Sequence, residues 1–218
     1  MDNTLALLTE RVREHFQHHG SDHDFYHIER VYNLAMHILE QEGGDPTVIA
    51  YAALLHDVSD HKLNGGVLND NGRVAKIWLE ELHVAPEIID RVLEVVDHVS
   101  YKGAGVADVD GSLELTIVRD ADRLDAIGAI GIARAFHFGG SRNRPFYIPN
   151  TNPVLHSDFE SYSKDEGHTI NHFYEKLLLL KDRMQTKTAK RIAEKRHQLM
   201  VDFLEQFHAE WEGSDGKY

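Results

Sequence analysis

The chain has 218 residues, of which 42% are hydrophobic and 27% charged, and this is the composition of a globular protein and excludes a disordered one. Its formal net charge of −13 at pH 7 disfavours binding to a polynucleotide or an anionic membrane, because such binding uses clustered Lys and Arg. It contains no cysteine, which excludes disulfides, thiolate metal ligands and cysteine nucleophiles and predicts a reducing compartment.

Apolar residues recur at three- and four-residue spacing through most of the chain, and alternating strand-like runs are almost absent. We therefore predict an all-α fold, a helical bundle that forms a single domain over residues 1–218. In chain order, the predicted helices cover residues 5–16, 25–41, 46–57, 74–82, 86–99, 113–126, 127–138, 168–183 and 186–211.

Several segments between and within these helices have distinct signals. The pair Gly43-Gly44 ends the second helix, and residues 104–111 form a loop. Residues 139–153 contain Gly, Asn and Pro and are predicted to form a mobile lid. In the last helix an apolar stripe at four-residue spacing predicts internal packing, in preference to a partner-binding face; it comprises Leu199, Phe203, Phe207 and Trp211.

Targeting and membrane signals are absent from the sequence. The N-terminus has no basic region before an apolar run, and no stretch approaches the ~20 apolar residues that a bilayer span needs. With the absence of cysteine, this predicts a cytoplasmic protein.

The dipeptide His56-Asp57 is the first candidate for chemistry. The dipeptide alone is not specific, since His23-Asp24 repeats it, but His56-Asp57 follows small and apolar residues that are predicted to be buried. Buried Asp is rare unless it is paired or bound to metal. From the pattern alone, a metal-ligand role and a capping or salt-bridge role are both open. Asp60 lies three residues after Asp57 and could converge with the pair.

Asp122 lies within the charged segment 119–125, which precedes a run of small apolar residues over 126–131. Small residues let another helix approach closely, so side chains from different helices could meet here. Asp122 and Asp125 share a helix face. Asp120 points about 200° away from Asp122, and we predict that it and some neighbouring arginines lie on a solvated face.

His27 is the fourth residue of a ladder at four-residue steps, after His15, His19 and His23. Residues 20–22 are Gly-Ser-Asp, which disfavour a continuous helix, so the ladder is predicted to be broken there. We assign the three earlier histidines, and His18, structural or surface roles.

Together these residues resemble the HD superfamily of metal-dependent phosphohydrolases, whose signature is a His, an adjacent His-Asp pair and a distant Asp. The resemblance extends to the flanking residues 24–31, 54–58 and 119–129 and covers a motif-bearing core of about residues 20–180, with C-terminal helices over 168–211 packed on it. It implies a helical bundle of the HD-domain type, with a metal held by His27, His56, Asp57 and Asp122.

The resemblance also implies a reaction and a cofactor. Mixed imidazole and carboxylate ligands suit Mn, Fe, Co, Ni or Zn, and suit Mg less well. The expected reaction is hydrolysis of a phosphate ester or phosphoanhydride bond in a small phosphorylated substrate, and the resemblance favours a nucleotide. The protein would then be a nucleoside triphosphate pyrophosphohydrolase or a nucleotidase. Release of pyrophosphate and release of phosphate both stay open.

Further residues have roles in this interpretation. Asp60 is the candidate for orienting or deprotonating the attacking water, because related HD nucleotidases carry a Glu there. Lys62 and Lys102 are candidates for binding phosphate, with solvated surface lysines as the alternative. Asp125 and His98 are candidates for supporting the ligands or lining the cavity.

Two other functions stay open from the sequence. One is a non-catalytic metal-dependent nucleotide sensor on the same scaffold. The other is an HD-type di-iron oxygenase, which needs further His ligands; His61 and His98 are available, but no convincing second set is evident.

Overall fold

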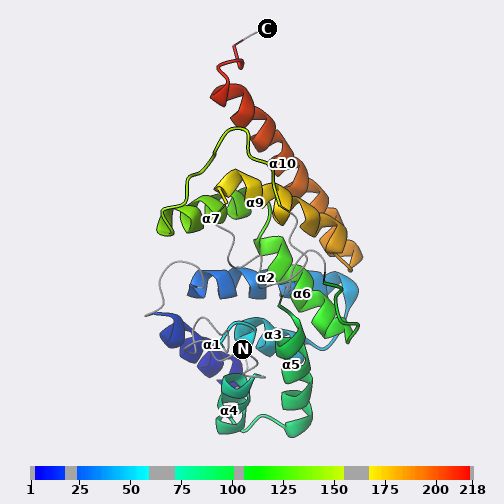
Figure 1. The fold of residues 1–218 in the computed structure, drawn as a ribbon. Coiled ribbons are helices and arrows are strands. Elements are labelled where there is room, and N and C mark those ends of the chain that lie inside the picture. Colours follow the sequence, from blue (N-terminus) through cyan, green and yellow to red (C-terminus); the bar gives the residue numbers. More distant parts are fainter. Residues whose placement is uncertain (1–2, 18–23, 59–71, 101–105, 155–166, 217–218) are drawn as a thin grey trace. The chain divides into compact units, whose positions relative to one another are not determined.

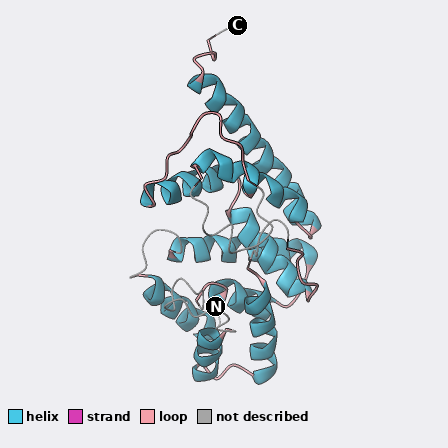
Figure 2. Cartoon of the chain, viewed as in Figure 1, coloured by secondary structure: helices cyan, strands magenta, loops and turns pink. Residues whose placement is uncertain are grey.

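The computed structural model of the chain describes residues 3–17, 24–58, 72–100, 106–154 and 167–216. The regular structure in these ranges is helical, without a strand (Figure 1, Figure 2), which confirms the predicted all-α fold. None of these helices combines the length and hydropathy needed to cross a bilayer. They are α1 Asn3–Phe16, α2 Phe25–Glu42, α3 Pro46–Leu55, α4 Arg73–Glu81, α5 Pro86–His98, α6 Leu113–Asp125, α7 Gly128–Ser141, α9 Thr169–Glu175, the 3-10 helix η1 Leu177–Arg183 and α10 Lys187–Trp211.

These elements belong to two compact units. Unit 1 comprises residues 1–101, 107–122 and 185–188, and so contains α1 to α5 and most of α6. Unit 2 comprises residues 102–106, 123–184 and 189–218, and contains α7, α9, η1 and most of α10. The single domain expected over residues 1–218 stays a prediction.

In unit 1 the central element is α3, which contacts α1, α2 and α5. Every residue of α3 from Val48 to Leu55 is buried, so this helix has no solvent-facing side beyond its first turn. Helix α4 packs against α5. A helix that is apolar on all sides has its lowest free energy inside the core, which explains why the others surround it.

The starts of α2 and α3 are fixed by capping residues that the sequence places just before them. The Asp24 carboxylate accepts a hydrogen bond of 2.8 Å from the His27 amide, and the Asp45 carboxylate accepts from the Thr47 and Val48 amides at 2.9 and 3.3 Å. Such caps satisfy amides that lack a partner within the helix. Helix α2 ends at Gly43, as predicted, where φ is +82°.

Unit 2 has an aromatic core. Phe203 and Phe207 of α10 lie on the predicted apolar stripe, and their ring centroids are 6.1 Å apart. Phe203 stacks on Phe173 of α9 at 5.7 Å, and Phe207 stacks on Trp211 at 6.1 Å. The Phe203 and Phe207 rings of the stripe therefore pack within unit 2, but Leu199 is 45% exposed and Trp211 is 46% exposed, so the predicted internal packing holds for part of the stripe.

Two predicted segments of unit 2 differ from the structure. The single helix expected over 168–183 is divided into α9 and η1 at Lys176, whose φ of −139° is not helical. The mobile lid expected over 139–153 is not supported, because α7 continues to Ser141 and the following residues bond to α9. The amide of Thr169 donates to the Pro145 carbonyl at 3.0 Å, and the amide of Ile170 donates to the Phe146 carbonyl at 3.0 Å.

Candidate metal centre

Helix α2 positions His27 in its first turn. The Asp24 cap bonds to the His27 amide itself, so the backbone of this residue is fixed at the start of the helix. The imidazole points inward, and its side chain is only 3% exposed. A polar ring buried to this degree needs a partner for each nitrogen.

Helix α3 delivers His56 and Asp57 directly after its last buried turn. The Nδ1 atom of His56 lies 2.8 Å from the Ala53 carbonyl oxygen, which can only accept a hydrogen bond. Nδ1 therefore carries the proton in neutral His56, and the Nε2 lone pair faces the interior. This arrangement, in which a backbone carbonyl holds one imidazole nitrogen, is typical of a metal-ligating His.

Helix α6 brings Asp122 to the same place. Its Oδ1 lies 3.6 Å from His27 Nε2 and 3.9 Å from His56 Nε2. The Oδ2 atom of Asp57 lies 3.4 Å from His27 Nε2 and 3.5 Å from His56 Nε2. The two Nε2 atoms are 3.3 Å apart. The structure thus brings together the four predicted ligands, which come from α2, from the turn that follows α3 and from the more distant α6.

We define these residues as the His/Asp cluster: His27, His56, Asp57 and Asp122. Two donors that lie about 2.1 Å from one ion are about 3.0–3.5 Å apart at right or tetrahedral angles, close to the separations in the cluster. The converging atoms are nitrogens with lone pairs and carboxylate oxygens, which repel one another unless a proton or a cation lies between them. His27, His56 and Asp57 are buried and could hold a metal ion. The donor set and its geometry therefore fit a divalent metal.

Three of the predicted functional residues cannot be placed. Asp60, Lys62 and Lys102 lie outside the described residues, as does the spare His61. Their roles as water-orienting and phosphate-binding residues stay predictions.

The two residues predicted to support the ligands have other contacts. Asp125 pairs with Arg134 of α7, and Arg123 donates to the Arg183 carbonyl at 3.0 Å. The Nδ1 atom of His98 lies 2.8 Å from the Glu94 carbonyl oxygen, within α5. These contacts do not include the His/Asp cluster, and the supporting roles of Asp125 and His98 stay predictions.

The prediction of a solvated face around Asp120 is wrong. Asp120 is 0% exposed, and Arg119 and Arg123 are each 2% exposed. The Asp120 carboxylate accepts from the Gln185 amide at 3.0 Å and from the Thr186 amide and hydroxyl at 2.8 Å each. No local pattern reveals this burial, because the residues that cover Asp120 lie some 65 positions further along the chain.

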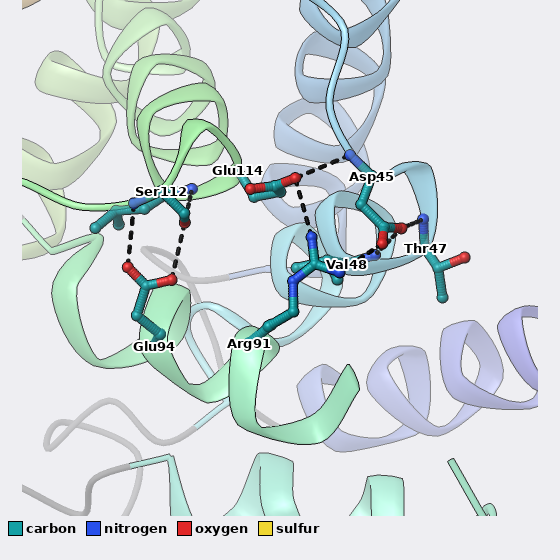
Figure 3. Close-up of polar contacts among 8 residues, drawn as sticks. Asp45, Thr47, Val48, Arg91, Glu94, Ser112 and Glu114 are labelled. Carbon is teal, nitrogen blue, oxygen red and sulfur yellow. Dashed lines mark hydrogen bonds and ion pairs between the residues drawn. The ribbon is translucent and has the colours of Figure 1, made fainter. Parts of the chain in front are cut away.

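Another polar network, which the sequence analysis missed, joins α3, α5 and α6 (Figure 3). Arg91 of α5 donates to Asp45 Oδ2 at 2.7 Å and to Glu114 Oε1 at 3.1 Å. Glu114 also accepts from the Asp45 amide at 2.9 Å. Burial alone would raise the pKa of Asp45, but the hydrogen bonds from Arg91 and from two backbone amides outweigh it and lower that pKa below its ordinary value. The only local signal was Asp45 before Pro46, which indicates a helix cap.

Known proteins resemble this chain over nearly its whole length. The HD domain family matches residues 24–127, which include all four cluster residues. The uncharacterized protein YpgQ of Bacillus subtilis is 38% identical over 201 residues, covering 91% of this chain and 89% of its own. Its crystal structure in complex with ADP superposes with a TM-score of 0.73, at 34% identity, covering 93% of this chain and 97% of that one.

Two further crystal structures show the same likeness. A Lactobacillus plantarum protein has a TM-score of 0.84 at 34% identity, covering 98% of this chain and 99% of its own. An HD-superfamily hydrolase from Bacillus thuringiensis has a TM-score of 0.76 at 40% identity, covering 95% of this chain and 96% of that one. These matches show that the chain belongs to the HD superfamily.

Proposed function

We propose that this protein is a metal-dependent phosphohydrolase that cleaves phosphate ester or phosphoanhydride bonds in a nucleotide. The observation that carries the proposal is the convergence of two imidazole nitrogens and two carboxylate oxygens in a member of the HD superfamily. The nucleotide as substrate class is supported by the similar YpgQ protein, which was crystallised with ADP.

In this proposal His27, His56, Asp57 and Asp122 hold a divalent ion, with Mn, Fe, Co, Ni or Zn suited better than Mg. Such an ion, when bound, would polarise a phosphoryl oxygen and acidify a water molecule. Two carboxylates offset the double positive charge, so the site would be close to neutral before a phosphate arrives.

The chain's own residues then have three tasks. The Ala53 carbonyl holds His56 in the tautomer whose Nε2 can ligate. Asp60 orients the attacking water and takes its proton. Lys62 and Lys102 offset the negative charge of the substrate phosphates. Asp125 and His98 are proposed only as supporting positions.

The test begins with metal-free protein purified without a His-tag. Mn²⁺, Co²⁺, Zn²⁺ or Mg²⁺ is added back, and nucleoside mono-, di- and triphosphates are assayed for phosphate release with and without added inorganic pyrophosphatase. We expect turnover with Mn²⁺ or Co²⁺, and a pyrophosphatase-dependent signal would identify pyrophosphate as the product. A chelator should abolish turnover but leave most of the helical circular dichroism, because the core of unit 1 is large and apolar.

The other functions predict different results. A nucleotide sensor would bind nucleotide in equilibrium dialysis without turnover under any metal. A di-iron oxygenase would contain two iron atoms per chain in elemental analysis. Within the described ranges a single group of three or more candidate ligands is found, that of His27, His56 and Asp57.

A further inference from the structure

The 185–188 segment links the two helices that carry His27 and Asp122. On one side Asp120 of α6 accepts hydrogen bonds from Gln185 and Thr186. On the other side the Thr188 amide donates to Glu42 Oε1, at the end of α2, at 2.7 Å. The segment belongs to unit 1, together with these partners and the His/Asp cluster. We call residues 185–188 the clip segment.

The hydrogen bonds to the clip segment lie on the side of α6 that faces away from Asp122. Residues two apart on a helix point about 200° from one another, so Asp120 and Asp122 project on nearly opposite sides. A carboxylate with 0% exposure and several donors is held in one orientation, because losing any donor leaves a buried charge unsatisfied. The clip segment therefore fixes the rotation and depth of the helical turn that bears Asp122.

Arg119 also holds this turn of α6, through hydrogen bonds to another part of unit 1. Its guanidinium donates to the carbonyls of His98 and Val109 at 3.1 Å each. It is 2% exposed and lies three residues before Asp122. The turn is thus tied both to the clip segment and to the end of α5.

Asp122 needs this support more than the other cluster residues. Its side chain is 26% exposed, against 12% for Asp57 and 3% or less for the two histidines. Side-chain packing constrains it least, and its separations from the two Nε2 atoms, 3.6 and 3.9 Å, are the widest measured for the cluster. The position of its carboxylate therefore depends mainly on where the backbone of α6 is held.

We infer that Asp120, through the clip segment, is a positioning residue that sets metal affinity by holding Asp122 in ligating position. The inference rests on the ligand set of the proposed function. Asp120 itself does not touch the metal. Replacing residues that orient metal ligands typically lowers metal affinity by about 10–100-fold, and we expect a loss in this range.

The experiment compares Asp120→Asn with Glu114→Gln. Both variants change a buried carboxylate of α6 to its amide, since Asp120 is 0% exposed and Glu114 is 9% exposed. Glu114, however, lies two helical turns from Asp122. Co²⁺ is titrated into each metal-free variant, its visible d–d absorption gives the dissociation constant, and urea unfolding gives the stability. Asp120→Asn should weaken Co²⁺ binding by about 10–100-fold. Glu114→Gln should change it by no more than about twofold, as expected for a distant site.

A second variant covers the case in which Asp120→Asn does not fold. Thr186→Val removes one hydroxyl donor to Asp120 but keeps the shape of the side chain and its amide bond. It should weaken Co²⁺ binding by several-fold, less than Asp120→Asn does, because the Gln185 and Thr186 amides still donate to Asp120. If Asp120→Asn or Thr186→Val binds Co²⁺ as the parent does, the inference is overturned.

Asp122→Ala separates this inference from the proposed function. If Asp122→Ala loses Co²⁺ and the clip-segment variants do not, the positioning role fails and the ligand set stands. If Asp122→Ala keeps Co²⁺, the ligand set fails and the positioning role fails with it. The absence of nucleotide hydrolysis would overturn the proposed reaction but leave the metal comparison intact.

Discussion

Helices α3 and α6 both bring ligands to the His/Asp cluster, but different forces hold them in place. Residues Val48 to Leu55 of α3 are all buried, and all of them are apolar or aromatic. Helix α6 instead buries charged residues on several sides, among them Glu114, Arg119 and Asp120. Helix α6 also buries apolar side chains, those of Leu115, Ile117, Val118, Ala121 and Leu124. The buried part of α3 is thus held by apolar packing, whereas α6 is held by apolar packing together with hydrogen bonds to buried charges.

The difference separates stability from positioning. Apolar burial supplies much free energy but has no direction, so it holds α3 in the core and fixes its orientation only through close packing. Hydrogen bonds to buried charges contribute little net stability, yet they have strict geometry and are costly to break singly. We therefore expect changes in α3 to affect unfolding, and changes around Asp122 to affect metal binding.

The largest effect should come from removing the ligand that α6 supplies. Asp122→Ala deletes a negative oxygen that the metal needs, so tight metal binding and nearly all hydrolysis should be lost. Elemental analysis and nucleotide turnover measure the two losses. The matched control is Asp110→Ala, an exposed aspartate that precedes α6 and should retain its metal. Full metal occupancy in Asp122→Ala would show that the four-ligand assignment is wrong.

Asp120→Ala is not a suitable control, although it is two residues from Asp122. The structure shows a buried carboxylate with three hydrogen-bond donors where the sequence predicts a solvated side chain. Its replacement leaves the Gln185 and Thr186 amides without their acceptor.

The next effect tests the chain that follows α3. Asp60→Asn removes the proposed base but keeps the size of the side chain, so turnover should fall by about 10²–10⁴. Metal content should stay at the level of the parent. An unchanged rate in single-turnover assays would remove Asp60 from the mechanism.

Lys62→Ala and Lys102→Ala should mainly raise the Michaelis constant for the nucleotide.

A core substitution in α3 tests the other half of the comparison. Ile49 is 0% exposed, and Ile49→Ala should lower the free energy of unfolding by about 2–5 kcal/mol, because it removes buried methyl groups and leaves a cavity. Urea denaturation measures the loss. Ile77→Ala, at 40% exposure on α4, should cost less than about 0.5 kcal/mol. The distinction between the helices fails if folded Ile49→Ala protein binds Co²⁺ much more weakly than the parent.

The same contrast explains which features the sequence predicted. The bounds of α3 follow from residues within or beside it, since Asp45, Pro46 and the apolar run are all local signals. The cluster residues were found because the flanking motifs are specific. The burial of Arg119 and Asp120 depends on His98, Val109 and the clip segment, which only the folded chain brings near. Local patterns cannot reveal partners at that separation.

The smallest expected effect concerns pH and the network in Figure 3, which connects the two helices. Burial by itself raises the pKa of Asp45, but Arg91 and the Val48 and Thr47 amides lower it more, so the folded pKa lies below the ordinary value of an Asp carboxyl. A carboxyl whose pKa is depressed on folding contributes stability above its unfolded pKa and loses it as pH falls through the folded pKa. Asp45 should therefore stabilise the protein at pH 5 and above, and progressively less below about pH 4.

Asp45→Asn isolates this contribution, because Asn caps a helix about as well as Asp but carries no charge. At pH 7 the parent should exceed the variant in free energy of unfolding by no more than about 1 kcal/mol, since Arg91 is 45% exposed and solvent screens the pair. The difference should shrink as the pH is lowered from 5 to 3, because protonated Asp45 no longer attracts Arg91. Urea unfolding of both proteins at several pH values measures the difference directly. The other carboxyls titrate in both proteins, so their contributions to the free energy of unfolding largely cancel in the difference. A difference that stays constant over this range would show that the charge of Asp45 does not stabilise the junction between α3 and α6.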